Sequence, residues 1–555
     1  MKLYIMTDLH YYSRRNWKCD PYSVPRVNDQ MQFRESEEIL REAFDAVLAD
    51  KECHTVLLTG DLTRNGEIVS HEDLIKILEE YTAKGLKILA FTSTHDYKDR
   101  EDRGFGIDQC KPEYIGYATG YNEKGEPERN VPCLEREDLR ALYAPYGRND
   151  AVSVNEYTFS YTYDLDDNWR LFAMNDDFKT AKKGQPRGYP DSEYEWIDKE
   201  IARAKADGKK IFFATHHPLI APSPMFGIIG KNDLLARGRE FAEKLAEYGV
   251  SVIFTGHSHV HDISFVTARN GKPVYDVSTS ALCGFPPQFR KAEFLEDGTV
   301  KVETVTLTTL SRYDLKGKPL PEYCREGFFG VIEHMIRAMG SDEKTFAYFA
   351  NGISIRPYTV HKLWFLIRPF GKFINNLTFG KARRLCRKEC GVSKEKLGDK
   401  AKEKVVPVIM KMVENLYAGN ANIDPASPEY RIIMGAISII DGLIRLFRIN
   451  LRKITGYATV AELVEPLLFN NGIDDYTATL DPETPPAPRV KLPVFHSNKA
   501  PGIVIAAVLL LVAFFPVWLV AGAVCGIVFA IKSAESKDPK YLVPEPLNPS
   551  FTESV

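Results

Sequence analysis

The chain has 555 residues, well above the length at which a single hydrophobic core stops growing, so at least two folded units are expected. Lys and Arg number 72 against 75 Asp and Glu, and the formal net charge of −3 excludes a polycation that wraps nucleic acid. Hydrophobic residues at 44% and charged residues at 26% exclude a mainly disordered, collagen-like or many-pass membrane protein.

The first region, from residue 1 to about residue 313, alternates short β-branched or aromatic runs with stretches of helical spacing. The run at 2–7 is short and leads into Asp8 and His10, which indicates a first strand rather than a secretory signal. Helices are predicted at 35–49, 70–84 and 191–205. This alternation is typical of an α/β domain.

Polar residues directly follow an apolar run at five points of this region. They are Asp8 and His10, Gly60 and Asp61, His95 and Asp96, His216 and His217, and His257 and His259. Ligands gather beyond the carboxyl ends of strands in open α/β sheets, so the five loops can converge on one site. Asp together with several His and no Cys favours one or two divalent metals in an open catalytic centre. Such a centre is net positive, which favours an anionic substrate such as a phosphate ester.

In order and spacing these clusters resemble the motifs of the calcineurin-like metallophosphoesterases: D-x-H, G-D, G-N-H-D/E, an H followed by x-P, and G-H-x-H. The matching segments are Asp8-Leu9-His10, Gly60-Asp61, His216-His217-Pro218 and Gly256-His257-Ser258-His259. The resemblance covers residues 1–313 and implies a four-layer αββα sandwich, here in a bacterial-type, membrane-anchored member. It also implies two divalent ions (Mn, Fe or Zn) and hydrolysis of a phosphomonoester or phosphodiester by attack of a metal-bridging water.

Carried over by position, the resemblance assigns the metal ligands. The first metal is expected on Asp8, His10 and His259, the second on His216 and His257, with Asp61 as the bridge. The third motif departs from the pattern, because Thr94 stands where the family has a metal-binding Asn. A hydroxyl is a poorer donor than an amide oxygen, so the second metal is expected to bind loosely. The alternative is a non-catalytic metal- or phosphate-binding membrane scaffold or sensor.

Three further residues are candidates for contact with the reaction. His95 is expected to face the substrate phosphate or to protonate the leaving oxygen, and Asp96 to orient the loop or the imidazole. A simple turn residue is the alternative for Asp96. His261 is predicted to bind substrate, with a solvent-exposed histidine at a strand edge as the alternative.

The second region, 314–480, is predicted to be a helical accessory domain, because apolar residues recur at helical spacing in 331–339, 405–416 and 432–449. Nine Lys or Arg and no Asp or Glu lie in 356–388, interleaved with aromatic residues. Such a stretch favours membrane lipids as partners, with a solvated helix face as the alternative. Nucleic acid is the least favoured partner.

The C-terminal part is predicted to anchor the chain. Residues 481–500 form a Pro-rich linker, 501–531 carry no charge, and 532–555 form a short polar tail. An uncharged stretch of this length predicts a transmembrane or re-entrant segment. The expected localisation is therefore the cell membrane, with a single pass or hairpin anchor and a cytoplasmic catalytic domain.

Overall fold

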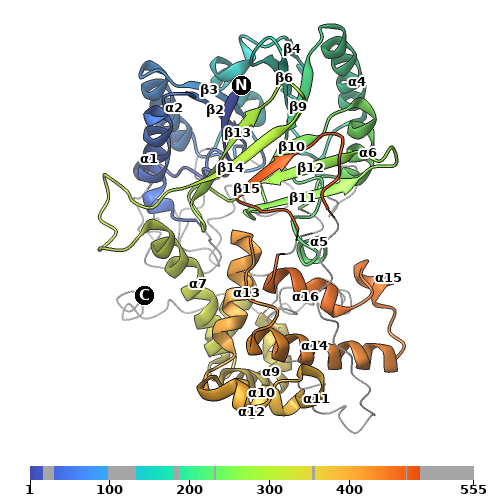
Figure 1. Cartoon of the computed structure of the whole chain (residues 1–555). Coiled ribbons are helices and arrows are strands. Elements are labelled where there is room, and N and C mark those ends of the chain that lie inside the picture. The colour runs from blue at the N-terminus through green and yellow to red at the C-terminus, as the bar shows by residue number, and fades with distance from the viewer. Residues whose placement is uncertain are drawn as a thin grey trace.

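The computed structural model describes residues 1–16, 31–64, 66–97, 133–179, 187–230, 233–352, 357–470 and 472–487. In this part of the chain two β-sheets lie face to face, and a helical region lies beyond one end of them (Figure 1). The carboxyl end of β1 points toward the helical region, so that region lies on the side where the strand-end loops emerge.

The first sheet has six strands in the order β15-β14-β13-β1-β2-β3. Their bounds are β1 Lys2–Met6, β2 Thr55–Thr59, β3 Lys87–Phe91, β13 Gln288–Phe294, β14 Val300–Thr306 and β15 Thr477–Leu480. Strands β1, β2 and β3 are parallel, with Tyr4 opposite Val56 and Val56 opposite Ile88. The carboxyl ends of these three strands therefore meet at one edge of the sheet.

The second sheet has seven strands in the order β11-β12-β10-β9-β6-β5-β4. Their bounds are β4 Ser153–Val154, β5 Tyr161–Asp164, β6 Trp169–Ala173, β9 Lys210–Ala214, β10 Val252–Thr255, β11 Asp262–Thr267 and β12 Pro273–Ser278. Strands β6, β9, β10 and β12 are parallel neighbours, and β11 is an edge strand that pairs with β12 in antiparallel fashion. A separate short hairpin joins β7 (Phe178–Lys179) to β8 (Arg187–Gly188).

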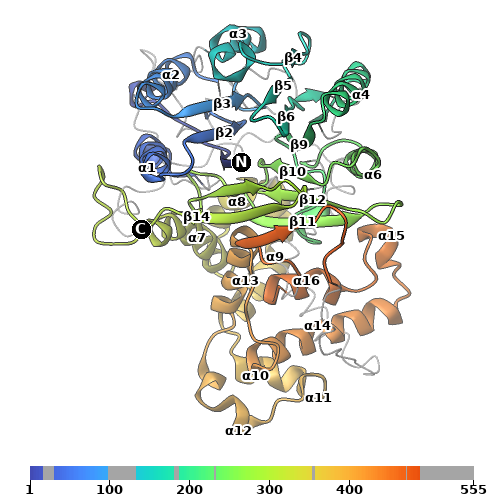
Figure 2. The same cartoon turned by 45° about the horizontal axis from the view of Figure 1, so that its top comes forward.

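Helices cover the outer faces of both sheets, as Figure 2 shows: α1 (Ser36–Ala49) and α2 (Ile68–Ala83) on the first, α4 (Asp191–Ala206) and α6 (Gly238–Tyr248) on the second. Alternation along β2 produces this layering, because Val56 and Leu58 pack in the core that contains α1 and α2. Leu57 points the other way, into the core between the sheets. These layers are consistent with the predicted αββα sandwich, and the three helical patterns predicted in this region are confirmed.

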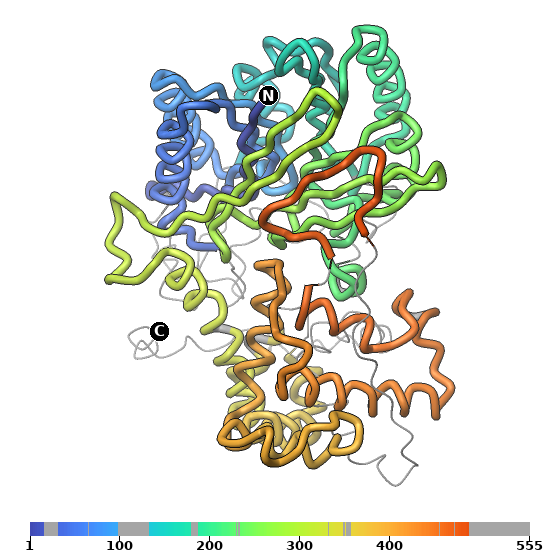
Figure 3. Tube along the Cα trace, in the orientation of Figure 1, coloured from blue at the N-terminus to red at the C-terminus, as the bar shows by residue number. Residues whose placement is uncertain are grey.

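The helical region lies between β14 and β15 in sequence. Its helices are α7 Leu320–Ala338, α8 Glu343–Gly352, α9 Pro357–Asn375, α10 Phe379–Leu385, α11 Arg387–Cys390, α12 Lys394–Leu397, α13 Val406–Ala418, α14 Pro428–Leu446, α15 Leu451–Thr455 and α16 Val460–Leu468. Figure 3 shows the chain returning from this region to the first sheet, where β15 pairs with β14. The region is thus an insertion between two adjacent strands, and the predicted boundaries at 313 and 480 stay a prediction.

Two short helices of the first region lie at loops near the carboxyl ends of the strands: α3 (Arg136–Leu142) and α5 (Phe226–Ile229). Met225, just before α5, and Ile228 within it are buried in the core of the helical insertion, among residues of α13, α14 and α16. The loop after His216 and His217 is therefore held by the insertion through apolar packing.

The predicted membrane anchor needs correction. Among the residues that the structure describes, no helix is both long enough and apolar enough to cross a membrane. This finding contradicts the C-terminal transmembrane segment in the predicted fold, and it also counts against the predicted anchor and localisation at the cell membrane. Residues 501–531, on which the prediction rested, lie outside the described residues, as does the chain from 488 to 555.

Candidate metal centre

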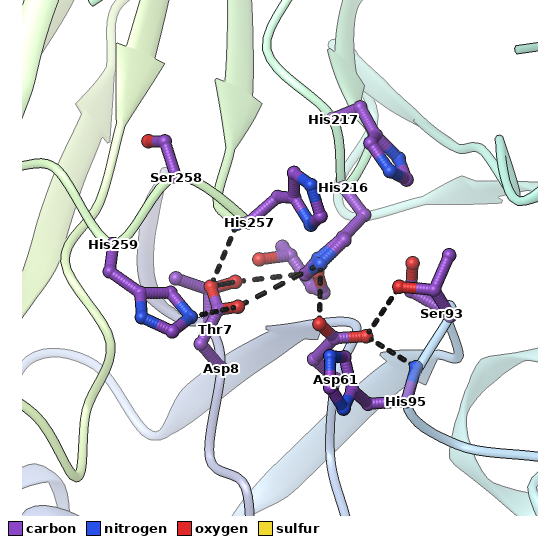
Figure 4. A network of polar contacts seen from close by, with 12 residues as sticks. Thr7, Asp8, Asp61, Ser93, His95, His216, His217, His257, Ser258 and His259 are labelled. Carbon is purple, nitrogen blue, oxygen red and sulfur yellow. Dashed lines mark hydrogen bonds and ion pairs between the residues drawn. The ribbon is translucent and has the colours of Figure 1, made fainter. Parts of the chain in front are cut away.

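Five loops meet where the two sheets face each other, and each follows a buried strand. Asp8 follows β1, Asp61 follows β2, Thr94 to Asp96 follow β3, His216 follows β9 and His257 follows β10. In Figure 4 the His216 ring lies between the carboxylates of Asp8 and Asp61. Residues almost 250 positions apart in sequence are therefore neighbours in space, as the strand-end positions predicted.

Two groups of three side chains have the spacing of metal sites. The first contains Asp8, His10 and His259, and the second contains Asp61, His216 and His257. Within each group one ligand atom per residue lies within 4.8 Å of the others. All six side chains were predicted as metal ligands, and the structure brings all six together.

Short contacts join the two groups into one centre. Oδ1 of Asp8 lies 3.2 Å from Nε2 of His259 and 3.7 Å from Nε2 of His216. On the other side, Nε2 of His216 lies 3.0 Å from Oδ2 of Asp61. His216 is therefore next to a carboxylate of each group.

The backbone is strained at this centre. Five of the six side chains come from residues in the left-handed conformation: Asp8 at φ 51°, His10 at 40°, Asp61 at 49°, His257 at 59° and His259 at 55°. Each such residue costs about 1–3 kcal/mol and persists only where the surroundings determine it, which is typical of functional sites. Backbone bonds supply part of that constraint, since His257 N donates to Oδ2 of Asp8 at 2.9 Å.

Glycines allow the loops to approach one another closely. Gly60 has φ +89°, and a Cβ at this position would lie 2.7 Å from Cβ of Ser93 and 2.9 Å from Nδ1 of His216. A Cβ on Gly256 would lie within 3 Å of both Thr7 and Asp8. The glycines of the G-D and G-H-x-H motifs are therefore required for packing around the centre.

The residues of the centre fit divalent cations. Oδ1 of Asp8 and Nε2 of His216 are buried and have no hydrogen-bond partner within the described ranges. Nδ1 of His216 donates to the carbonyl of Thr59 at 2.9 Å, which directs the lone pair of Nε2 toward the carboxylates. Mixed imidazole and carboxylate donors suit transition-type divalent ions, so the two groups indicate two such ions without fixing their identity.

The electrostatics of the centre point the same way. Burial by itself raises the pKa of the Asp8 carboxyl, but the neighbouring His216 and His259 hold that pKa well below its usual range. Burial lowers the pKa of His216, whereas Asp61 and Asp8 raise it, with a net pKa of about 10. The two buried carboxylates thus create a negative potential strong enough to favour positive charge at this point.

The third loop binds the carboxylate of Asp61. Oδ1 of Asp61 accepts hydrogen bonds from the backbone N–H of His95 at 2.9 Å and from the Thr94 hydroxyl at 3.4 Å. Nδ1 of the His95 ring donates to the carbonyl of Arg64 at 2.6 Å. The ring of His95 also lies edge-on to that of His10, with centroids 5.0 Å apart. Thr94 and His95 therefore lie next to Asp61 and His10, and their predicted roles stay predictions.

Asp96 binds backbone rather than the His95 imidazole. Its carboxylate accepts hydrogen bonds from the N–H groups of Thr63 and Ser93, each at 2.8 Å. The side chain is fully buried, and burial together with the charge of Asp61 raises its pKa to about 8. Asp96 thus connects the loops after β2 and β3, and its predicted catalytic role stays a prediction.

The predicted substrate contact of His261 needs correction. The side chain is fully buried, and Nε2 lies 2.9 Å from the hydroxyl of Thr304 while Nδ1 lies 3.4 Å from the backbone nitrogen of Ser280. The ring also lies next to Tyr476, with centroids 5.6 Å apart. Because both ring nitrogens have protein partners, the ring is not available to a substrate, and it is not solvent-exposed either.

Asp176 supports the centre, although the sequence did not single it out. Its carboxylate accepts from the backbone N–H of His217 at 2.7 Å and bonds to Nδ1 of the same residue at 2.8 Å. The His217 ring in turn packs on that of His257, with centroids 4.1 Å apart. Asn175, Asp176 and Asp177 follow the apolar run of β6, so the rule of polar residues at strand ends could have found Asp176.

The part of the chain that contains the centre matches a known protein family. Residues 1–261 match the family described as calcineurin-like phosphoesterases. No curated protein is significantly similar to the chain. One similar solved structure is a dimetal phosphatase from Danio rerio, with 12% sequence identity and a TM-score of 0.39, covering 55% of this chain and 96% of that chain. All six side chains of the two groups lie within residues 1–261.

Proposed function

Because residues 1–261 form a calcineurin-like phosphoesterase domain and the chain is accordingly a hydrolase of phosphoric ester bonds, we propose that its substrate is a phosphomonoester or phosphodiester. Hydrolysis takes place at the centre formed by the two groups, with two divalent cations bound. The observation that carries the proposal is the pairing of two three-residue donor groups through Asp8, His216 and Asp61.

Each group holds one cation in this proposal. Asp8, His10 and His259 hold the first, His216 and His257 hold the second, and Asp61 lies between them. When bound, the two cations activate water and stabilise the negative charge that develops on the phosphoryl oxygens. Thr94, whose hydroxyl bonds to Asp61, replaces the stronger amide donor at the second position and leaves that cation more easily lost.

The protein side chains orient the ligands and contact the phosphate. The Thr59 carbonyl keeps the proton of His216 on Nδ1, so that Nε2 is the ligand atom. His95 uses Nδ1 to donate to the Arg64 carbonyl, so a hydrogen bond from Nε2 to a phosphoryl or leaving oxygen requires the imidazolium form. His95 is the residue that we assign to this contact.

The substrate class follows from charge. Two divalent ions outweigh two carboxylates, so the loaded centre attracts an anion. A nucleotide and a phosphorylated lipid headgroup both present a suitable phosphate ester. The metal centre is common to esters of either kind, so it does not choose between them.

The test uses the full chain with Mn²⁺ and two generic substrates, an aryl phosphomonoester and a bis-aryl phosphodiester. Asp61→Asn keeps the shape and the oxygen that accepts from His95 but removes the charge between the cations. We expect hydrolysis to fall by at least about a hundredfold and the metal content to drop. Asp198→Asn, at an acidic residue of α4 that pairs with Lys244, is the matched control. Full activity in Asp61→Asn would be incompatible with the proposal.

A further inference from the structure

A buried carboxylate that follows the last helix of the insertion bonds to β11, the strand that comes after the loop of His257 and His259. We propose that Asp475 is a positioning residue that holds the loop carrying His257 and His259. The insertion then contributes to metal binding through the position of this loop. This inference rests on the function proposed above. It assigns a role to residues that lie outside the 1–261 match.

Asp475 connects the insertion to an edge strand of the second sheet. The side chain is 3% exposed, and Oδ1 accepts a hydrogen bond from the backbone N–H of Ile263 in β11 at 3.0 Å. Oδ2 accepts from the N–H of Asn420 at 2.7 Å and from Nδ2 of Asn470 at 2.9 Å. Three donors therefore fix the orientation of the carboxylate. One of them belongs to β11, the strand that begins three residues after His259.

The end of α13 provides a second contact with the same loop. The backbone N–H of His261 donates to the carbonyl of Tyr417 at 2.8 Å. Gly419 has φ +69°, and a Cβ at this position would clash with the His261 carbonyl and lie 2.9 Å from Cβ of Asp475. The insertion thus contacts the loop at His261 and the following strand β11 at Ile263, and the two parts are closely packed at Gly419.

A buried arginine joins these contacts to both sheets. Arg290 of β13 is fully buried, and its guanidinium donates to the backbone carbonyl of Asp475 and, at 2.9 Å, to that of Ser278 in β12. The backbone N–H of Thr304 in β14 donates to the carbonyl of Tyr476 at 2.8 Å. Residues 475 and 476 therefore lie at the place where the edges of the two sheets come together.

The bonds of Tyr417 to His261 and of Asp475 to Ile263 together form a clamp next to this loop. The strain in the loop explains why the clamp should affect metal binding. His257 and His259 are both in the left-handed conformation, which the chain leaves unless its flanks are held. His257 belongs to one ligand group and His259 to the other. Loosening the loop should therefore weaken both metal sites together, whereas a change at Thr94 should affect only the second.

The experiment measures binding of Co²⁺ to the metal-free full chain, followed through the visible absorption of the bound ion, which reports ligand geometry. We expect Asp475→Ala to lower the affinity at both sites by about tenfold and to change the absorption spectrum. Asp474→Ala is the matched control. Its carboxylate also accepts three hydrogen bonds, from Asn420, Tyr476 and Thr477, but none of them comes from β11.

The outcomes separate the inference from the proposed function. If the unmodified chain binds no Co²⁺, the metal centre itself is wrong. If the unmodified chain binds Co²⁺ and Asp475→Ala has the same affinity and spectrum, the proposed role of Asp475 is wrong. The role is also wrong if Asp474→Ala has the same effect as Asp475→Ala. Should Asp475→Ala fail to fold by circular dichroism, Asp475→Asn decides by the same criteria. Asp475→Asn keeps an oxygen that accepts from Ile263. Its loss in Co²⁺ affinity is expected to be at least half as large as the loss expected for Asp475→Ala.

Discussion

Oδ1 of Asp8 lies 3.7 Å from Nε2 of His216, and neither buried atom has a hydrogen-bond partner in the part of the chain that the structure describes. Asp8 follows the first strand of one sheet, and His216 follows a central strand of the other. With the His216 proton on Nδ1, both atoms are hydrogen-bond acceptors, and two buried acceptors that face each other are costly in the metal-free protein. A cation on each side removes that cost, so metal binding should stabilise the fold.

Metal removal is the first consequence that can be measured. Chelation should lower the melting temperature of the full chain, and added Mn²⁺ should restore it in a concentration-dependent manner. An excess of metal of about a hundredfold over the dissociation constant stabilises by about 2.7 kcal/mol. Asp8→Asn should respond much less to chelation. An equal melting temperature with and without chelator would show that the centre does not bind metal in the folded chain.

Substitution of Thr94 tests the weak point of the second site. The hydroxyl lies 3.4 Å from Oδ1 of Asp61 in a buried position. Thr94→Asn introduces an amide oxygen and should lower the Mn²⁺ concentration for half-maximal activity by roughly tenfold. Thr94→Val has nearly the same shape without the hydroxyl and should not tighten binding. If both variants behave alike, the side chain at position 94 does not face the metal.

Gly60→Ala should damage both the fold and the second site. The new Cβ would meet Ser93 and His216 at a residue whose φ is +89°. Gly271→Ala is a matched control, since φ is +84° there and no atom lies within 4 Å of the new Cβ. We expect a loss of about 1 kcal/mol for Gly271→Ala from strain alone, and about 3 kcal/mol or more for Gly60→Ala. Chemical denaturation measures both, and equal losses would mean that the loop gives way easily.

His261 should be important for stability more than for catalysis. His261→Ala removes the contacts with Thr304 and Ser280 and should cost about 1–3 kcal/mol of unfolding free energy. Its kcat/KM should change at most tenfold, or about 1.4 kcal/mol. His257→Ala, four residues earlier in the chain, should abolish hydrolysis. A loss of activity in His261→Ala as large as in His257→Ala would give the ring a direct part in the reaction.

His71 should make the fold sensitive to acid. Burial lowers its pKa to about 4, although the bond to the Asp96 carbonyl opposes the shift. Between the unfolded pKa near 6.5 and the folded value, the unfolded chain binds a proton that the folded chain does not. Stability therefore falls as the pH falls through this window, by about 3 kcal/mol. Unfolding curves of His71→Gln should be flatter over the same window, while His54→Gln, on the surface, should keep the slope.

The strand-end rule explains how much of the site could be predicted. Asp8, Asp61, His216 and His257 each follow an apolar run, and polar residues at the ends of parallel strands meet at one edge whatever their separation in sequence. The helical patterns also depend only on residues close in sequence, since a stretch such as 35–49 shows its apolar face within four turns. The prediction of a membrane anchor rested on composition alone and was contradicted.

Local patterns of the sequence therefore determined the strand ends that carry Asp8, Asp61, His216 and His257 and helices such as α1, α2 and α4, because each depends on a few residues. The two facing sheets and the expected metal ligands follow from the resemblance to a family, which depends on motifs spread along residues 1–313. Only the tertiary structure decided that His261 is buried, that Asp176 supports His217, and that Asp475 returns to hold β11. Asp475 and Ile263 are 212 positions apart, and no local periodicity encodes such a contact. It exists because the helical insertion starts and ends on the same sheet, which brings the segment between α16 and β15 back against β11.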